Sequence, residues 1–134
     1  SLGTQLRTVE DIMLTGNKIP FVQENLKMKK ALQILSKKKL GFLIIRGNNN
    51  YTKGIITDGQ IRRFSEKKSN IYELSVKEIM TKNPISIDKD SLAVKALRLM
   101  NEKKITSLCV HTKKNKNKTI GILHIHTLLE SSIN

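Results

Sequence analysis

The stretch VEDIM at residues 9–13 returns as VKEIM at residues 76–80, a shift of 67 positions. The stretch GIIT at residues 54–57 returns as GILH at residues 121–124 with the same shift of 67. Between these pairs, apolar residues at i, i+3, i+4 and i+7 start at Met28 and recur 65 positions further on. Matched elements in one order indicate an internal duplication, and the spacing predicts an amphipathic helix in each copy.

Each copy predicts the element order β-α-β-β-α over about 60 residues. A proline opens a short strand, Pro20 in the first copy and Pro84 in the second. Asn25 and Ser91 are the expected N-caps of the amphipathic helices. The first copy is expected to hold a helix at 26–38, strands at 41–46 and 51–57, and a helix at 58–66; the second, a helix at 91–103, strands at 107–112 and 119–124, and a helix at 125–132.

A single unit of this size buries too little apolar surface to be stable alone. We therefore expect an α+β (α/β) fold in which two pseudo-two-fold related β-α-β-β-α units pack through their sheets. The expected domains are residues 1–68 and 69–134, with a cleft between them.

The composition is that of a soluble globular protein, with 38% hydrophobic and 27% charged residues in a chain of 134. The net charge is +14, but the cations are 20 Lys and 5 Arg, and aromatic residues make up only 4%. Because bidentate phosphate and base contacts come mainly from Arg, and base stacking from aromatic rings, this composition disfavours nucleic-acid binding. No run is long enough to span a membrane, and the single cysteine, Cys109, predicts a reducing, cytoplasmic location.

Three longer segments carry a family resemblance: VEDIMLTG at residues 9–16, GIITDGQIRR at 54–63 and GILHIHTLL at 121–129. With the duplication, they resemble the tandem cystathionine-β-synthase (CBS) domain pair, or Bateman module, over nearly the whole chain. The TDG stretch with its two arginines, and the HIH stretch, resemble the C-terminal CBS pair of arabinose-5-phosphate isomerases of the sugar-isomerase (SIS) family. The resemblance implies a regulatory, nucleotide-sensing module that forms dimers.

No catalytic constellation is found in the 134 residues, neither a phosphate-binding loop nor a nucleophile elbow. The resemblance implies that a sugar-isomerase domain upstream of residue 1 interconverts arabinose-5-phosphate and ribulose-5-phosphate, for Kdo and lipopolysaccharide or capsule biosynthesis. The fragment itself is then expected to be inert and to regulate that enzyme.

The turn from Thr57 into the following helix is the candidate ligand site. A helix N-terminus presents unpaired N–H groups and a partial positive charge, which suit a phosphate, and Arg62 or Arg63 could add a guanidinium. The same four residues, from Thr57 to Gln60, match the capping box S/T-x-x-E/Q, so they could simply begin the helix. The two roles are compatible.

Nucleotide-binding members of the family carry G-x-x-T-x-x-D, in which the Asp holds the ribose hydroxyls. This chain has Gln60 and Thr127 at the two Asp positions, and His124 at the second Thr position. The alternatives are a weakened nucleotide site, a site for a nucleotide sugar such as CMP-Kdo, or a structural oligomerisation module without ligand; a nucleic-acid-binding module is a further alternative. The expected ligand-binding residues are Thr57, Asp58, Gln60, Arg63, Ile19, Pro20, Pro84, His124, His126 and Thr127.

The remaining chemistry-bearing residues do not follow the spacing of a structural zinc site. Cys109 and His111 are two residues apart and share one face of the predicted strand. We interpret Cys109 as a small buried residue, His124 and His126 as polar groups of the second cleft, and the helix methionines as core residues. No metal ion or certain cofactor is expected.

Overall fold

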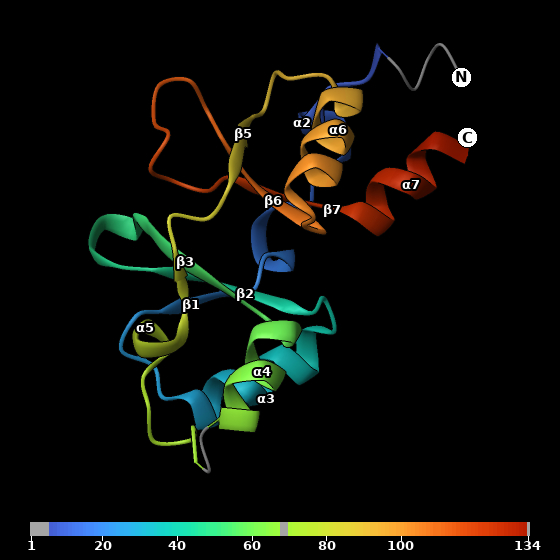
Figure 1. Cartoon of the computed structure of the whole chain (residues 1–134). Helices are drawn as coiled ribbons and strands as arrows, with labels where there is room; N and C mark the ends of the chain where they lie inside the picture. The colour runs from blue at the N-terminus through green and yellow to red at the C-terminus, as the bar shows by residue number, and fades with distance from the viewer. Residues whose placement is uncertain (1–5, 68–69, 134) are drawn as a thin grey trace. The chain divides into compact units, whose positions relative to one another are not determined.

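The structure is a computed structural model in which residues 6–67 and 70–133 are described (Figure 1). The chain divides into two compact units. One consists of Asn17–Pro84 and is called here the central unit. The other joins Ser1–Gly16 to Ile85–Asn134 and is called the terminal unit.

The central unit is built on a four-stranded sheet in the order β1-β2-β3-β4, in which β1 and β2 are parallel and the other pairs antiparallel. Leu43 and Ile45 alternate along β2, and both are fully buried in one cluster with Met28 of the amphipathic helix. The elements are β1 (Phe21–Gln23), α3 (Met28–Lys38), β2 (Phe42–Arg46), β3 (Thr52–Thr57), α4 (Asp58–Lys67), α5 (Val76–Ile79) and β4 (Thr81–Lys82), with short 3-10 turns at Gly16–Lys18 and Asn48–Asn50.

The terminal unit repeats this plan with a three-stranded sheet in the order β5-β6-β7. Leu108 and Val110 of its central strand are buried in one cluster with Met100. The elements are α2 (Val9–Ile12), β5 (Ser86–Asp88), α6 (Ala93–Lys103), β6 (Ser107–His111), β7 (Gly121–His124) and α7 (Ile125–Ile133). The predicted α+β class and the order β-α-β-β-α are thus confirmed in both copies, as are Met28 and Met100 as core residues.

The compact units divide the chain at other positions than the predicted domains, 1–68 and 69–134. Helix α2 belongs to the first repeat but lies in the terminal unit, and α5 belongs to the second repeat but lies in the central unit. Each repeat therefore supplies its first helix to the unit that the other repeat builds. The expected boundary itself, between residues 68 and 69, lies outside the described residues.

Backbone hydrogen bonds explain this exchange of first helices. In the terminal unit, Val9 N–H donates to Ser91 O at 2.8 Å, and Ala93 N–H donates to Arg7 O at 2.8 Å. The central unit repeats both bonds at the aligned positions, from Val76 to Leu26 O and from Met28 to Leu74 O, each at 2.8 Å. The exchanged segment thus satisfies backbone groups that the loop and the helix would otherwise leave unpaired.

The same bonds show why Asn25 and Ser91 are wrong as N-caps. The N-cap positions are Lys27 and Leu92, whose side chains make no capping hydrogen bond. The first N–H groups of α3 and α6 are instead satisfied by carbonyl oxygens of the exchanged segments. A cap supplied from a distant part of the chain leaves no side-chain signature beside the helix.

Candidate functional site

The start of α4 is fixed by a hydrogen bond to the loop before β2. Asp58 N–H donates to Gly41 O at 3.0 Å. Gly41 has a φ of +79°, and a Cβ added to it would lie 3.2 Å from Asp58 Oδ2. Glycine at this position therefore allows both the turn and the close approach of the Asp58 carboxylate.

Thr57 and Gln60 form the predicted capping box. Thr57 N–H donates to Gln60 Oε1 at 3.0 Å, and Gln60 N–H donates to Thr57 Oγ1 at 3.3 Å. The free end of the amide is also engaged, because Gln60 Nε2 donates to Thr81 Oγ1. Gln60 therefore ties the start of α4 to β4. Thr81 was not among the predicted site residues, and no local pattern points to it because it lies 21 positions further along the chain.

Two guanidinium groups lie beside the first turn of α4. A Cβ added at Gly59 would lie 3.1 Å from Arg63 Nη1 and 3.9 Å from Arg62 Nη2. Both arginine side chains are exposed, and neither has an ion pair among the residues that the structure describes. The positive end of a helix dipole and two cations thus gather at one place, with Asp58 as the acidic residue of the first turn. This arrangement suits a doubly charged oxyanion.

The start of α7 is the aligned position in the terminal unit. Ile125 N–H donates to Thr106 O at 2.8 Å, which repeats the bond between Asp58 and Gly41. His126 N–H donates to His124 Nδ1 at 3.1 Å, and the two rings stack with their centroids 4.9 Å apart. The His124 ring thus takes the capping place that a hydroxyl or carboxylate usually holds. Thr127, at the aligned position of Gln60, is half-buried.

His124 makes the stability of the terminal unit depend on pH. Burial, with the neighbouring His126 second, lowers the pKa of His124 below its usual 6.5. The unfolded chain therefore binds this proton more readily, so stability is lost as the pH falls below about 6.5. We expect the thermal midpoint to drop between pH 7.5 and 5.5, and to drop less in His124→Gln, which keeps an acceptor for the cap. The same measurement on His126→Gln serves as the comparison. If the pH dependence of the thermal midpoint is unchanged in His124→Gln, this assignment is contradicted.

The predicted ligand residues Ile19, Pro20 and Pro84 belong to the central unit but not to the turn before α4. Ile19 is 5% exposed, and Pro20, also buried, accepts a hydrogen bond from Ile44 N–H at 3.0 Å. Pro84 is half-buried at the end of the unit. The hydrogen bond to Pro20 O joins the start of β1 to β2. The ligand role of Ile19, Pro20 and Pro84 stays a prediction.

Cys109 is a buried thiol, as interpreted from the sequence. It lies in β6, is 3% exposed, and burial raises its pKa to about 11. A thiol that stays protonated near neutral pH is a poor metal ligand. Within residues 6–67 and 70–133, His, Cys, Asp and Glu side chains form no group of three or more that could hold a metal ion.

No helix in these ranges is both long and apolar enough to cross a bilayer.

Comparisons with known proteins agree with this architecture. The sequence model of the CBS domain matches residues 9–67 and 76–134. Arabinose 5-phosphate isomerase KdsD of Escherichia coli (strain K12) is 36% identical over 134 residues, which cover 99% of this chain and 40% of that protein. KdsD of Francisella tularensis subsp. tularensis is 39% identical over 131 residues, 97% of this chain and 39% of that protein. The chain thus spans about 40% of the length of the curated relatives it matches.

Solved structures show the same fold. The crystal structure of CBSX2 in complex with AMP superimposes with a TM-score of 0.80 at 25% identity, covering 94% of this chain and 96% of that chain.

Proposed function

We propose that this chain, which belongs to the CBS domain family, is the regulatory CBS pair of a sugar-phosphate isomerase and senses a nucleotide or nucleotide sugar. The identity of 36% with KdsD supports the assignment to an arabinose 5-phosphate isomerase. In this proposal a catalytic domain outside the chain interconverts arabinose 5-phosphate and ribulose 5-phosphate. The CBS pair binds a small anionic effector, and the protein assembles as a homo-oligomer in the cytoplasm.

The pair of guanidinium groups at the start of α4 carries the proposal. Cations at a helix N-terminus are unfavourable by about 0.3–1 kcal/mol each, because they face the positive end of the dipole. Arg62 and Arg63 nevertheless lie beside Gly59 in the first turn. A phosphate would be stabilised by both guanidinium groups and by the helix end, and it would remove their mutual repulsion.

The state of Gln60 favours recognition of phosphate over recognition of ribose. Its carbonyl oxygen accepts from Thr57 N–H and its amide donates to Thr81 Oγ1. The side chain that stands at the family's ribose-binding Asp position is therefore already committed to the protein. CMP-Kdo, a nucleotide sugar, is the specific effector that we propose from the implied pathway. The AMP bound by CBSX2 is a second compound to test.

The bond from Gln60 to Thr81 offers a route for the signal. Helix α4 carries the proposed anion site, and β4 lies directly before the point where the chain passes into the terminal unit. A ligand regulates only if it binds two arrangements with different affinity. In this proposal, the two arrangements differ in whether Gln60 holds β4.

We expect a charge-removing variant of the site to lose ligand affinity. Phosphate, AMP, ATP, CMP and CMP-Kdo are titrated against the 134-residue chain while the thermal midpoint is followed. A bound nucleotide raises the midpoint, and Arg62→Ala/Arg63→Ala lowers the affinity about 10- to 100-fold, because two hydrogen bonds to a charged group are lost. Lys29→Ala/Lys30→Ala, on exposed positions of α3, removes the same charge and leaves the affinity unchanged. Equal losses in both variants contradict the site.

The capping role of Gln60 also favours the second function, a structural oligomerisation module without ligand. If none of the compounds moves the midpoint, while sedimentation shows a dimer, this function replaces the sensor. Nucleic-acid binding would instead show an affinity that falls steeply with salt.

A further inference from the structure

The two exchanged helices dock through the same backbone bond but with reversed charges. Glu10 N–H donates to Lys89 O at 3.0 Å, and Lys77 N–H donates to Glu24 O at 3.3 Å. Glu10 and Lys77 are the second residues of α2 and α5, and Glu24 and Lys89 follow directly after β1 and β5. All four are aligned positions of the duplication, and the charge is opposite at both pairs of positions.

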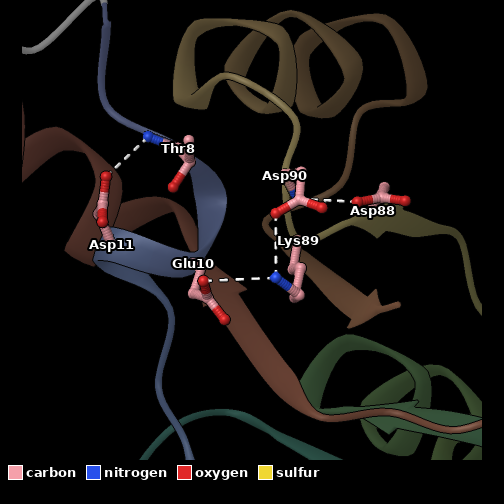
Figure 2. Close-up of polar contacts among 6 residues, drawn as sticks. All are labelled: Thr8, Glu10, Asp11, Asp88, Lys89 and Asp90. Carbon is pink, nitrogen blue, oxygen red and sulfur yellow. Dashed lines mark hydrogen bonds and ion pairs between the residues drawn. The ribbon is translucent and has the colours of Figure 1, made fainter. Parts of the chain in front are cut away.

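In the first of these contacts, the side chains of Glu10 and Lys89 also form an ion pair (Figure 2). Lys89 Nζ lies 3.5 Å from Glu10 Oε1 and 3.0 Å from Asp90 Oδ1. The loop is held in place because Asp90 N–H donates to Asp88 Oδ1 at 2.8 Å. The neighbouring carboxylates, Asp90 first, raise the pKa of Lys89, so its charge is retained.

The second contact is looser. The Glu24 carboxylate lies against Gly47, where an added Cβ would be 2.5 Å from Glu24 Oε2 and 2.6 Å from Lys53 Cε. In the part of the chain that the structure describes, no ion pair within 4.0 Å joins Lys77 to Glu24. The contact that the structure gives for these two residues is the backbone hydrogen bond of 3.3 Å.

Apart from these charges, α2 and α5 present the same docking surface. Val9 and Val76 are both fully buried, and Ile12 and Ile79 are both 7% exposed. Each helix begins with a complete capping box, Thr8 with Asp11 and Ser75 with Glu78. Apolar packing and the capping pattern are therefore alike in the two helices, whereas the charge at the second position is opposite.

Docking of each helix on its own repeat would bring like charges together. Glu10 would meet Glu24, which shares its place beside Gly47 with Lys53, and Lys77 would meet Lys89. The selection acts on α2, because Asp88 and Asp90 flank Lys89, give the loop a net charge of −1 and would offset the repulsion between Lys89 and Lys77. We propose that Lys89, in the loop Asp88-Lys89-Asp90, is a docking residue for the acid at the second position of α2, and so contributes to the exchange of first helices between the repeats.

Amide hydrogen exchange measured by NMR on the full 134-residue chain tests this proposal, because the docking bonds use named amides. In Glu10→Lys, exchange at Val9 and residue 10 is expected to accelerate about fivefold, the upper range for one exposed ion pair. Glu10→Lys/Lys89→Glu restores most of the protection. Glu102→Lys makes the same charge change on an exposed position of α6 and leaves these amides unchanged. Equal acceleration in Glu10→Lys and Glu102→Lys, or no recovery in the double variant, overturns the proposal.

A second pair of variants tests selection itself. Glu10→Lys/Lys77→Glu places each helix opposite a like charge in the observed docking and opposite an unlike charge on its own repeat. We expect protection at Val9 to fall about fivefold, as in Glu10→Lys, because the ion pair with Lys89 becomes repulsive. Protection at Val76 falls less, since Lys77 has no ion pair with Glu24 in the described part of the chain. Adding Glu24→Lys and Lys89→Glu reverses all four charges and restores the protection. If the two-residue variant keeps native protection at both amides, charge does not select the partner.

Discussion

Valine in place of Gly54 or Gly121 is expected to lower the free energy of unfolding by about 3 kcal/mol, at the upper end for overpacking a core. A Cβ at Gly54 would lie 2.6 Å from Met80 Sδ and 2.7 Å from Thr81 O. The thioether can move, but the carbonyl belongs to β4, which pairs with β3 at this point. Relief of the clash therefore requires that the pairing opens. Urea unfolding followed by circular dichroism measures the loss.

The duplication provides an internal repeat of this experiment. A Cβ at Gly121 would meet Met13 Sδ and would lie 3.1 Å from Leu14 O, at the aligned positions of the other repeat. Gly16→Ala is the control, because nothing lies within 4 Å of a Cβ there, although its φ of +59° is unfavourable for alanine by about 1 kcal/mol. Native stability in the valine variants would show that β3 and β7 do not need the close approach.

These glycines illustrate what the sequence could predict. The stretches GIIT and GILH gave the repeat, the strands and the start of the following helices, because alternation and helical spacing are local properties. The observed helices at Met28–Lys38 and Ala93–Lys103 end where the periodicity predicts and begin two residues later. The predicted N-caps, Asn25 and Ser91, are wrong because the first N–H groups bond to carbonyls 46 and 86 positions away in the chain, at Leu74 and Arg7.

Some contacts of the candidate site could be predicted from the sequence and others could not. The capping box of Thr57 and Gln60, and the contact of the His124 and His126 pair, join residues two or three positions apart, so short patterns could point to them. Thr81 could not be predicted, because its position depends on pairing of β4 with β3. The packing of each first helix in the unit of the other repeat could not be predicted either, because it also depends on contacts between distant parts of the chain. Helices of four residues carry too little periodicity to indicate which sheet they pack on.

Alanine in place of Leu123 is expected to lower the free energy of unfolding by about 3 kcal/mol, because it leaves a cavity in a fully buried cluster. Leu123 lies in β7 in the second repeat, but its cluster contains Val9 and Ile12 of the first repeat. We therefore expect the variant to accelerate amide exchange at Val9 more than at Val76. Ile56→Ala, at the aligned position of the central unit, reverses this order, because Ile56 shares its cluster with Val76 and Ile79.

Leu129→Ala is the control for both variants, since this side chain is 44% exposed on α7 and its truncation costs within about 0.5 kcal/mol. The pattern of amide hydrogen exchange distinguishes two folds that have the same helices and strands. If first helices packed on their own repeats, Leu123→Ala would loosen α5 and Ile56→Ala would loosen α2. Faster amide exchange at Val9 in Leu123→Ala and at Val76 in Ile56→Ala follows only if the first helices are exchanged between the repeats. A cavity weakens the helices that pack against it, whichever repeat encodes them.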